Sequence, residues 1–318
     1  KLTSDSWVLI RPPGATDAAR AAADIVLTAP GLGAIVEAIV VARTIFRRMK
    51  NFVTYRIAAT LQLLIFFFIA VFAFPPLHYR PHPAPPPLQG EPWPAFFSIP
   101  VLMLMLITVV NDGTLIAIGY DNVIPSHIPD NWNLSALFAI AGVLALVPLG
   151  ASIFLLWCGL DSWNDGSVFR VIGLGGLKYG QIVTMIYLDL AVSAILTLFS
   201  ARSFDYFFWQ SMPSPILLGA TGVALVASTV IASTWPDSNS DGIPVLGMAY
   251  RSPRLLPLYI WIYCLVWWLI QDLTKVGFVR LLYFYNWFGV KNTMHRVKAG
   301  EIDDEQKDAG EIKNEDQV

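Results

Sequence analysis

The sequence predicts an all-α integral membrane protein, a six-transmembrane-helix bundle with a long cytosolic stalk helix and a short α/β segment. Of its 318 residues, 55% are hydrophobic and 14% charged, and mean hydropathy is +0.57, whereas soluble domains carry about 25% charged residues. Six apolar runs could each cross a hydrocarbon core about 30 Å thick, which needs roughly 20 helical residues. No Pro or Gly occurs between Ala34 and Phe74, so one helix of about 40 residues, roughly 60 Å long, can cross the hydrocarbon core and project beyond it.

The residues before the first apolar run predict the edge of a soluble domain and a stalk. Residues 1–13 have no clear period and stay unassigned. The stretch 14–31 joins a strong helix former at 18–23 to a β-like run at 24–28. One helix and one strand cannot bury a core, so 14–31 is interpreted as the trailing edge of an α/β domain, and the chain is expected to be part of a longer one. The stretch 32–51 is the predicted stalk, with a basic cluster just before the membrane.

The predicted membrane domain covers 52–274, and a cytosolic tail follows at 275–318. Ten Lys and Arg residues fall on the face of the two termini and five on the other, which favours cytosolic termini. Within the tail, 277–290 fits an interfacial helix. The two cysteines lie in or beside apolar runs and indicate neither a disulfide framework nor a metal site. The expected spans are 52–74, 97–118, 134–157, 181–200, 214–233 and 255–274.

One carboxylate, Asp112, lies inside the apolar run 97–120. An ionised side chain there costs about 2.5 to 3.5 kcal/mol even on the lenient insertion scale. Asn111, Gly113 and Thr114 surround it, so Asp112 occupies a small polar step with room for a neighbouring backbone or water. We predict that Asp112 carries an ion; the alternative is a structural hydrogen-bonding residue between helices.

Arg56 enters the first span about one turn from its cytosolic end, at nearly the depth of Asp112 on the next, antiparallel helix. The two side chains could therefore pair, and the alternative is a snorkelling interfacial arginine. Calcium needs six to eight oxygen ligands, and this region offers a cation instead. A positive neighbour repels a metal ion but suits a proton, because it favours proton release when close and uptake when moved away.

The other charged residues near the spans have simpler interpretations. Asp189, inside the fourth span, fits a helix-to-helix polar contact or a second transport group equally well. Asp272 and Lys275 are interpreted as interfacial anchors. Asp121 and Asp130 are expected to be solvated or capping residues of a cytosolic loop.

Three stretches carry a family resemblance: GATDAARAAADIVLTAPGL, IVEAIVVARTIFRRMKNFVTYRIA and LITVVNDGTLIAIGYDNVIPS. Together they resemble the carboxyl-terminal third of the P-type plasma-membrane proton ATPases of plants, fungi and protists. The match is dense from Gly14 to about Ser126 and consistent in helix count to about residue 280. The resemblance implies that 14–31 ends the phosphorylation domain, and that the spans are membrane helices five to ten.

By this resemblance Asp112 is the proton-binding carboxylate, with Asn111 and Thr114 beside it, and Arg56 matches the fungal-type arginine of the fifth helix. Plant relatives place that arginine where this sequence has Gln62, which makes Gln62 a secondary candidate. Asp189 is the other secondary candidate, because it lies well inside a span. Some fungal relatives carry a glutamate in the eighth helix, at the position of Ala194.

The family's motifs D-K-T-G-T and T-G-E-S do not occur in this sequence, and KLTSDSWVLIRPP stands where the hinge G-D-G-V-N-D-A-P is expected. The chain alone is therefore expected neither to bind nor to hydrolyse ATP. In the parent protein, ATP and Mg²⁺ are the implied substrate and cofactor.

The leading hypothesis is the membrane portion of a plasma-membrane proton exporter. Its expected partners are the lipid bilayer, the transported proton and upstream domains of the same polypeptide, with no nucleic acid. Two alternatives stay open: a non-catalytic six-helix channel or regulatory membrane protein, and a P-type pump for another cation.

Overall fold

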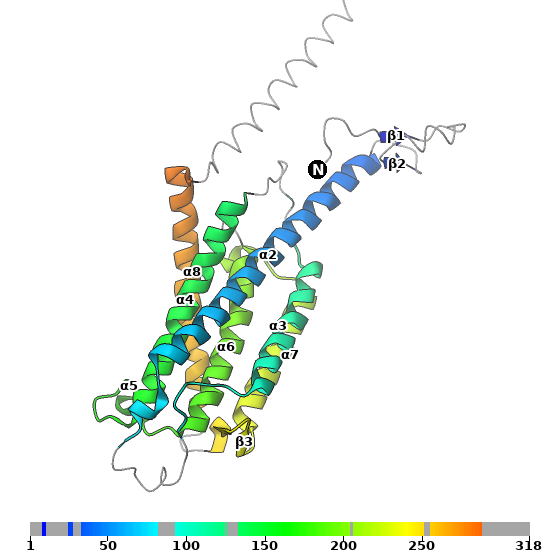
Figure 1. The fold of residues 1–318 in the computed structure, drawn as a ribbon. Coiled ribbons are helices and arrows are strands. Elements are labelled where there is room, and N and C mark those ends of the chain that lie inside the picture. The colour runs from blue at the N-terminus through cyan, green and yellow to red at the C-terminus, as the bar shows by residue number, and fades with distance from the viewer. Residues whose placement is uncertain are drawn as a thin grey trace, which may run out of the picture. The chain divides into compact units, whose positions relative to one another are not determined.

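The computed structural model describes residues 8–10, 25–27, 33–81, 93–123, 125, 133–203, 206–250 and 255–287. Six helices in these ranges are long and apolar enough to cross a bilayer, which confirms the predicted all-α membrane bundle (Figure 1). The chain divides into two compact units. One contains the described residues up to 50 together with 123 and 125, and the other, which contains the bundle, comprises the described residues of 51–122 and 133–288.

The bundle helices keep the expected order but differ at their ends from the predicted spans. The last helix runs unbroken through Gly277 to Tyr285, where the sequence indicated a span ending at 274 and a separate interfacial helix. Asp272 and Lys275 are buried rather than interfacial, so they do not mark the end of the helix. The six long helices are α2 (Gly33–Ala73), α3 (Val101–Ala117), α4 (Leu134–Leu160), α6 (Tyr179–Arg202), α7 (Pro215–Thr234) and α8 (Leu256–Tyr285).

The first unit contains a short parallel pair of strands, β1 (Val8–Ile10) and β2 (Ile25–Leu27), with Val8 opposite Ile25. β2 coincides with the β-like run, and β1 lies in the stretch left unassigned. The same unit includes the first 18 residues of α2, whose 41 residues form the single long helix that the sequence predicted. The helix expected at 18–23, Asp130, residues 82–92 and the tail from 288 lie outside the described residues.

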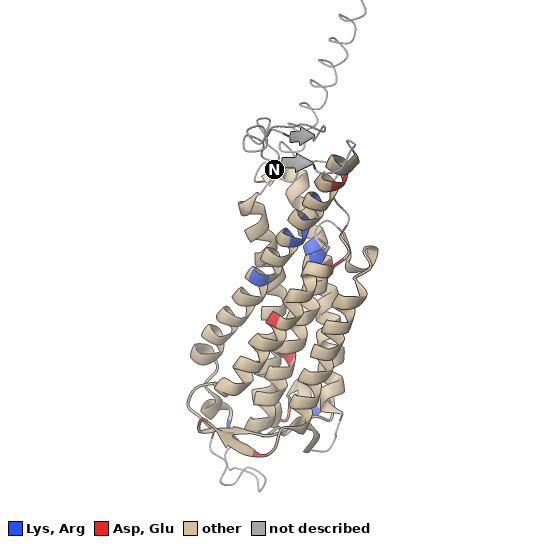
Figure 2. Cartoon of the chain, turned by 90° about the vertical axis from the view of Figure 1, so that its right-hand side faces the viewer, with Lys and Arg blue, Asp and Glu red and all other residues tan. Residues whose placement is uncertain are grey.

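Helix α6 is the centre of the bundle. It packs against α3, α4, α7 and α8, and 89% of its most apolar 18 residues are buried, against 22–33% for α2, α3, α7 and α8. Tyr179, Ile186 and Tyr187 on α6 are completely buried. Lys, Arg, Asp and Glu positions are sparse along these helices (Figure 2). The bundle therefore has a closed core around α6, whereas α2, α3, α7 and α8 leave most of their surface uncovered.

A proline inside α4 is accommodated by a side chain from α8. Pro148 has no N–H, so the carbonyl of Leu144, four residues earlier, loses its helical partner. Gln271 Nε2 donates to this carbonyl at 2.8 Å and to Thr197 Oγ1 at 2.9 Å. In a membrane, a freed backbone group must be satisfied within the protein, and Gln271 does this while joining α4, α6 and α8.

Short elements connect the helices at each end of the bundle. The antiparallel strands β3 (Ser238–Ser240) and β4 (Ile243–Val245) form a hairpin, and its two turn residues have positive φ, 56° for Asp241 and 76° for Gly242, as a tight primed turn requires. Asp241 Oδ2 accepts a hydrogen bond from Val101 N at the start of α3. The remaining short helices are η1 (Pro76–Tyr79), η3 (Ile118–Tyr120), η4 (Asp161–Trp163), α5 (Val168–Val171), η5 (Phe208–Gln210) and η6 (Met248–Tyr250).

Candidate functional site

The structure brings together the two charged residues that the sequence placed at one depth. Arg56 Nη1 on α2 forms an ion pair with Asp112 Oδ1 on α3. Antiparallel neighbouring helices make this possible, since α2 and α3 cross the bundle in opposite directions (Figure 1). The pair joins the longest helix, α2, to the helix that carries the candidate carboxylate.

The polar step around Asp112 is open on one side and closed on the other. A Cβ added at Gly113 would meet nothing within 4 Å, as expected for a position that leaves room for water or another helix. Thr114 is 2% exposed, and its hydroxyl donates to Asn111 O at 2.8 Å. Asn111 Oδ1 is buried without a hydrogen-bond partner in the described part of the chain. Unsatisfied buried polar atoms of this kind are typical of sites that hold water.

The ion pair lies at the surface of the described bundle, with both side chains about half exposed, 50% for Arg56 and 51% for Asp112. Leu64 and Phe68 on α2 and Val109 on α3 are also strongly exposed. An ion pair directly in hydrocarbon would be costly. This face therefore needs protein or water against it.

Asp189, the second carboxylate inside a span, lies in a different environment. It is 1% exposed in the core, where it accepts hydrogen bonds from Ser152 on α4 and from Cys264 on α8, the latter at 3.3 Å. These contacts join three helices, so they favour the helix-to-helix interpretation over a second transport group.

A small cavity lies beside Asp189, and Ser193 on its wall contacts the secondary candidate Gln62. The cavity has a volume of about 10 Å³, and Ser193 and Gln271 line it together with Asp189; this is close to the space that one water needs. Gln62 Nε2 on α2 donates to Ser193 Oγ at 2.9 Å. Gln62 therefore reaches the Asp189 region, while Arg56 reaches Asp112, and the structure keeps the two carboxylates on separate contacts.

The sequence did not predict two buried ion pairs near the carboxyl end of α6. Asp121, expected to be solvated or a cap, is 1% exposed and pairs with Arg202, whose Nε lies 2.7 Å from Asp121 Oδ2. The same carboxylate accepts a hydrogen bond from Ser214 N, at the start of α7. Arg202 and Asp121 are 81 residues apart, and no local spacing indicates such a pair.

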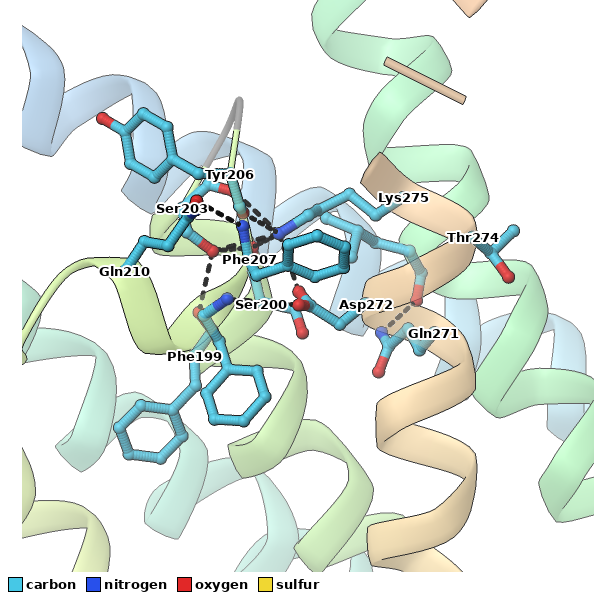
Figure 3. A network of polar contacts seen from close by, with 12 residues as sticks. Phe199, Ser200, Ser203, Tyr206, Phe207, Gln210, Gln271, Asp272, Thr274 and Lys275 are labelled. Carbon is cyan, nitrogen blue, oxygen red and sulfur yellow. Dashed lines mark hydrogen bonds and ion pairs between the residues drawn. The ribbon is translucent and has the colours of Figure 1, made fainter. Parts of the chain in front are cut away.

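The second missed pair is Lys275 with Asp272 on α8, where Nζ lies 2.7 Å from Oδ1 and both side chains are 1% exposed. The interpretation as interfacial anchors is wrong, because the end of α6 and the segment after it enclose these groups (Figure 3). Their spacing of three residues on one helix was the available signal; the burial was not visible in the sequence.

The arrangement at Arg56 and Asp112 suits the movement of a proton. A carboxylate takes up or releases a proton, and a guanidinium in contact favours its ionised form. In the residues that the structure describes, no group of three or more His, Cys, Asp or Glu side chains could hold a metal ion.

No family model matches the chain, but curated proteins do. Over 270 residues, 83% of this chain, it is 49% identical to "Probable proton ATPase 1A" and to "Probable proton ATPase 1B", both of Leishmania donovani. It is 30% identical over 300 residues, 87% of the chain, to "Probable plasma membrane ATPase" of Dictyostelium discoideum. The alignments cover 27%, 27% and 26% of these relatives, so the chain spans about a quarter of their length.

Proposed function

Because the chain belongs to the family of P-type plasma-membrane proton ATPases over most of its length, we propose that it is the membrane-transport portion of an ATP-driven proton exporter. Asp112 is the proposed group that takes up and releases the proton. The observation that carries the proposal is the ion pair between Arg56 and Asp112, a carboxylate and a counter-charge on two different helices.

In the proposed cycle, α2 couples events outside the membrane to Asp112. α2 is one helix from Gly33 to Ala73, so a tilt of its outer part would move Arg56 toward or away from the carboxylate. When Arg56 contacts Asp112, the positive charge of Arg56 favours release of the proton from Asp112. When the two side chains are apart, uptake of a proton by Asp112 is favoured. Asn111 and Thr114 are proposed to hold water beside Asp112, and Asp189 to hold α4, α6 and α8 together.

ATP and Mg²⁺ are proposed for the longer polypeptide, with ATP bound and hydrolysed by domains upstream of this chain. Membrane segments of that upstream part are proposed to cover the exposed face of α2 and α3. Both ends of the chain are proposed to be cytosolic in the plasma membrane, following the excess of basic residues on that side.

The test is proton pumping by the full-length protein in vesicles, with Asp112→Asn against Asp165→Asn. Asp165 is a matched control, since it also pairs with an arginine, Arg170 at 2.6 Å, but is 91% exposed outside the six spans. We expect Asp112→Asn to abolish ATP-driven acidification and Asp165→Asn to retain it. Acidification that survives Asp112→Asn would refute the assigned role.

The same vesicles distinguish the alternatives. Pumping that requires sodium or calcium would indicate a pump for another cation. Proton flux that persists without ATP and runs only down its gradient would indicate a channel. The expected result is uphill transport that needs ATP and neither metal ion.

A further inference from the structure

The ammonium of Lys275 lies in a cage of oxygen atoms at the carboxyl end of α6. Five oxygens surround Nζ within 2.7–3.1 Å: Ser203 O and Asp272 Oδ1 at 2.7 Å, Ser203 Oγ and Tyr206 O at 3.0 Å, and Ser200 O at 3.1 Å. Figure 3 shows them converging on Nζ from α6, the segment after it and α8. The Lys275 side chain is 1% exposed. The charge is therefore held by the protein and not by solvent.

The cage supplies more acceptors than the ammonium has protons. A lysine ammonium carries three N–H donors and accepts nothing, yet it faces five oxygens. Three of the five are backbone carbonyls, two of them, from Ser200 and Ser203, at the end of α6, where carbonyls lack helical partners and the helix dipole is negative. Such a set of oxygens is the environment in which carbonyls replace the hydration shell of a monovalent metal ion.

We propose that this cage is a monovalent-cation site which the chain fills with its own ammonium. Lys275 then acts as a built-in cation that holds α6, the segment following it and α8 together, so the protein needs no bound K⁺ there. The carboxylate of Asp272 sets the charge of the site, and Phe208 N holds its other oxygen at 3.1 Å. Removing the lysine side chain should leave a vacant site for an ion of similar size, K⁺ or NH₄⁺.

The neighbouring buried cation provides a contrast. Arg202 contacts both oxygens of Asp121, with Nε at 2.7 Å and Nη2 at 3.2 Å, and also donates to the carbonyls of Asn122, Ser211 and Met212. These oxygens are divided among three nitrogens, and the four around Nη2 lie at 3.2–3.4 Å, farther than the five around Lys275 Nζ. The planar guanidinium directs its donors along fixed lines. A spherical ion cannot reproduce this fork. Loss of Arg202 should therefore leave no site that K⁺ can fill.

The experiment measures thermal unfolding of the purified full-length protein in KCl, NH₄Cl or N-methylglucamine chloride at equal ionic strength. A ligand that binds only the folded state raises Tm as its concentration increases. For Lys275→Ala we expect K⁺ and NH₄⁺ to raise Tm by about 3 °C or more over N-methylglucamine. The wild type should show the same Tm in the three salts.

Two further variants make the response specific to the cage. Asp272→Asn combined with Lys275→Ala removes the charge of the site, and its response to K⁺ should be largely lost. Arg202→Ala should be destabilised equally in all salts. Equal Tm values for Lys275→Ala in the three salts would overturn the proposal. A rise of Tm in KCl as large as that of Lys275→Ala, in either the double variant or Arg202→Ala, would also overturn it. Failure of Lys275→Ala to fold in KCl and NH₄Cl as well as in N-methylglucamine would also overturn it. Tm does not depend on pumping, so the result is separate from the role of Asp112.

Discussion

The link between Pro148 and Gln271 makes a quantitative prediction about stability. Gln271 is 2% exposed, and its amide donates to the Leu144 carbonyl that Pro148 leaves free and to Thr197. In Gln271→Leu both bonds disappear and the carbonyl stays buried. The lost bond to Thr197 costs about 0.5–1.5 kcal/mol and the unpaired buried carbonyl of Leu144 about 1–3 kcal/mol, so we expect the free energy of unfolding to fall by about 1.5–4.5 kcal/mol.

The cause of this loss can be isolated with a second substitution. In Pro148→Ala the N–H of residue 148 can donate to the Leu144 carbonyl, so the carbonyl no longer depends on Gln271. Gln271→Leu should then cost about 1–2 kcal/mol less than in the wild-type background, a coupling within the range of contacting residues. Denaturant titration of the full-length protein in mixed micelles, for the two single variants and the double variant, measures this energy.

The control for the cycle is Gln210→Leu, at an exposed glutamine on η5 whose side chain accepts a hydrogen bond from Phe207 N. It should combine additively with Pro148→Ala. If Gln271→Leu also proved additive with Pro148→Ala, the amide would not be compensating for the proline, and the argument from the freed carbonyl would fail.

Three more predictions concern other parts of the bundle. Asp121→Ala removes one partner of a buried ion pair and should lower the free energy of unfolding by about 3–5 kcal/mol. Asp165→Ala, at an exposed pair, should change it by about 1 kcal/mol or less. Denaturant titration compares the two variants, and equal losses would contradict the argument from burial. Gly180→Ala should lower Tm, because its Cβ would lie 2.7 Å from Leu246 N, while Gly142→Ala meets nothing within 4 Å and should be tolerated; a thermal scan in which both behave alike would refute this. Asp189→Asn keeps an oxygen for Ser152, so vesicles should retain proton pumping; its loss would assign Asp189 a transport role.

The fold was predictable because membrane spans follow directly from apolar length. Continuous apolar runs and an uninterrupted stretch from Ala34 to Phe74 require only that backbone groups be satisfied within each helix. The depth of Arg56 and Asp112 followed from counting residues, since rise per residue is constant along two antiparallel helices. These inferences use local sequence alone, and the structure agrees with them.

The buried polar contacts were not predictable because they join residues that lie far apart in the sequence. Arg202 meets Asp121 across 81 residues, and Asp189 meets Ser152 and Cys264 on two other helices. Whether a charged residue near a helix end is an interfacial anchor or a buried partner depends on what packs over it, and no spacing within one helix contains that information.

The contacts of the two carboxylates support a moving edge on a fixed core. The Asp189 carboxylate is buried in the core and has hydrogen-bond donors on α4 and α8. The side chain of Asp112 is 51% exposed, and its ion pair is with Arg56 on α2, at an uncovered face of the bundle. A carboxylate there can change its surroundings without breaking the contacts that hold α4, α6 and α8 together, as alternating uptake and release require.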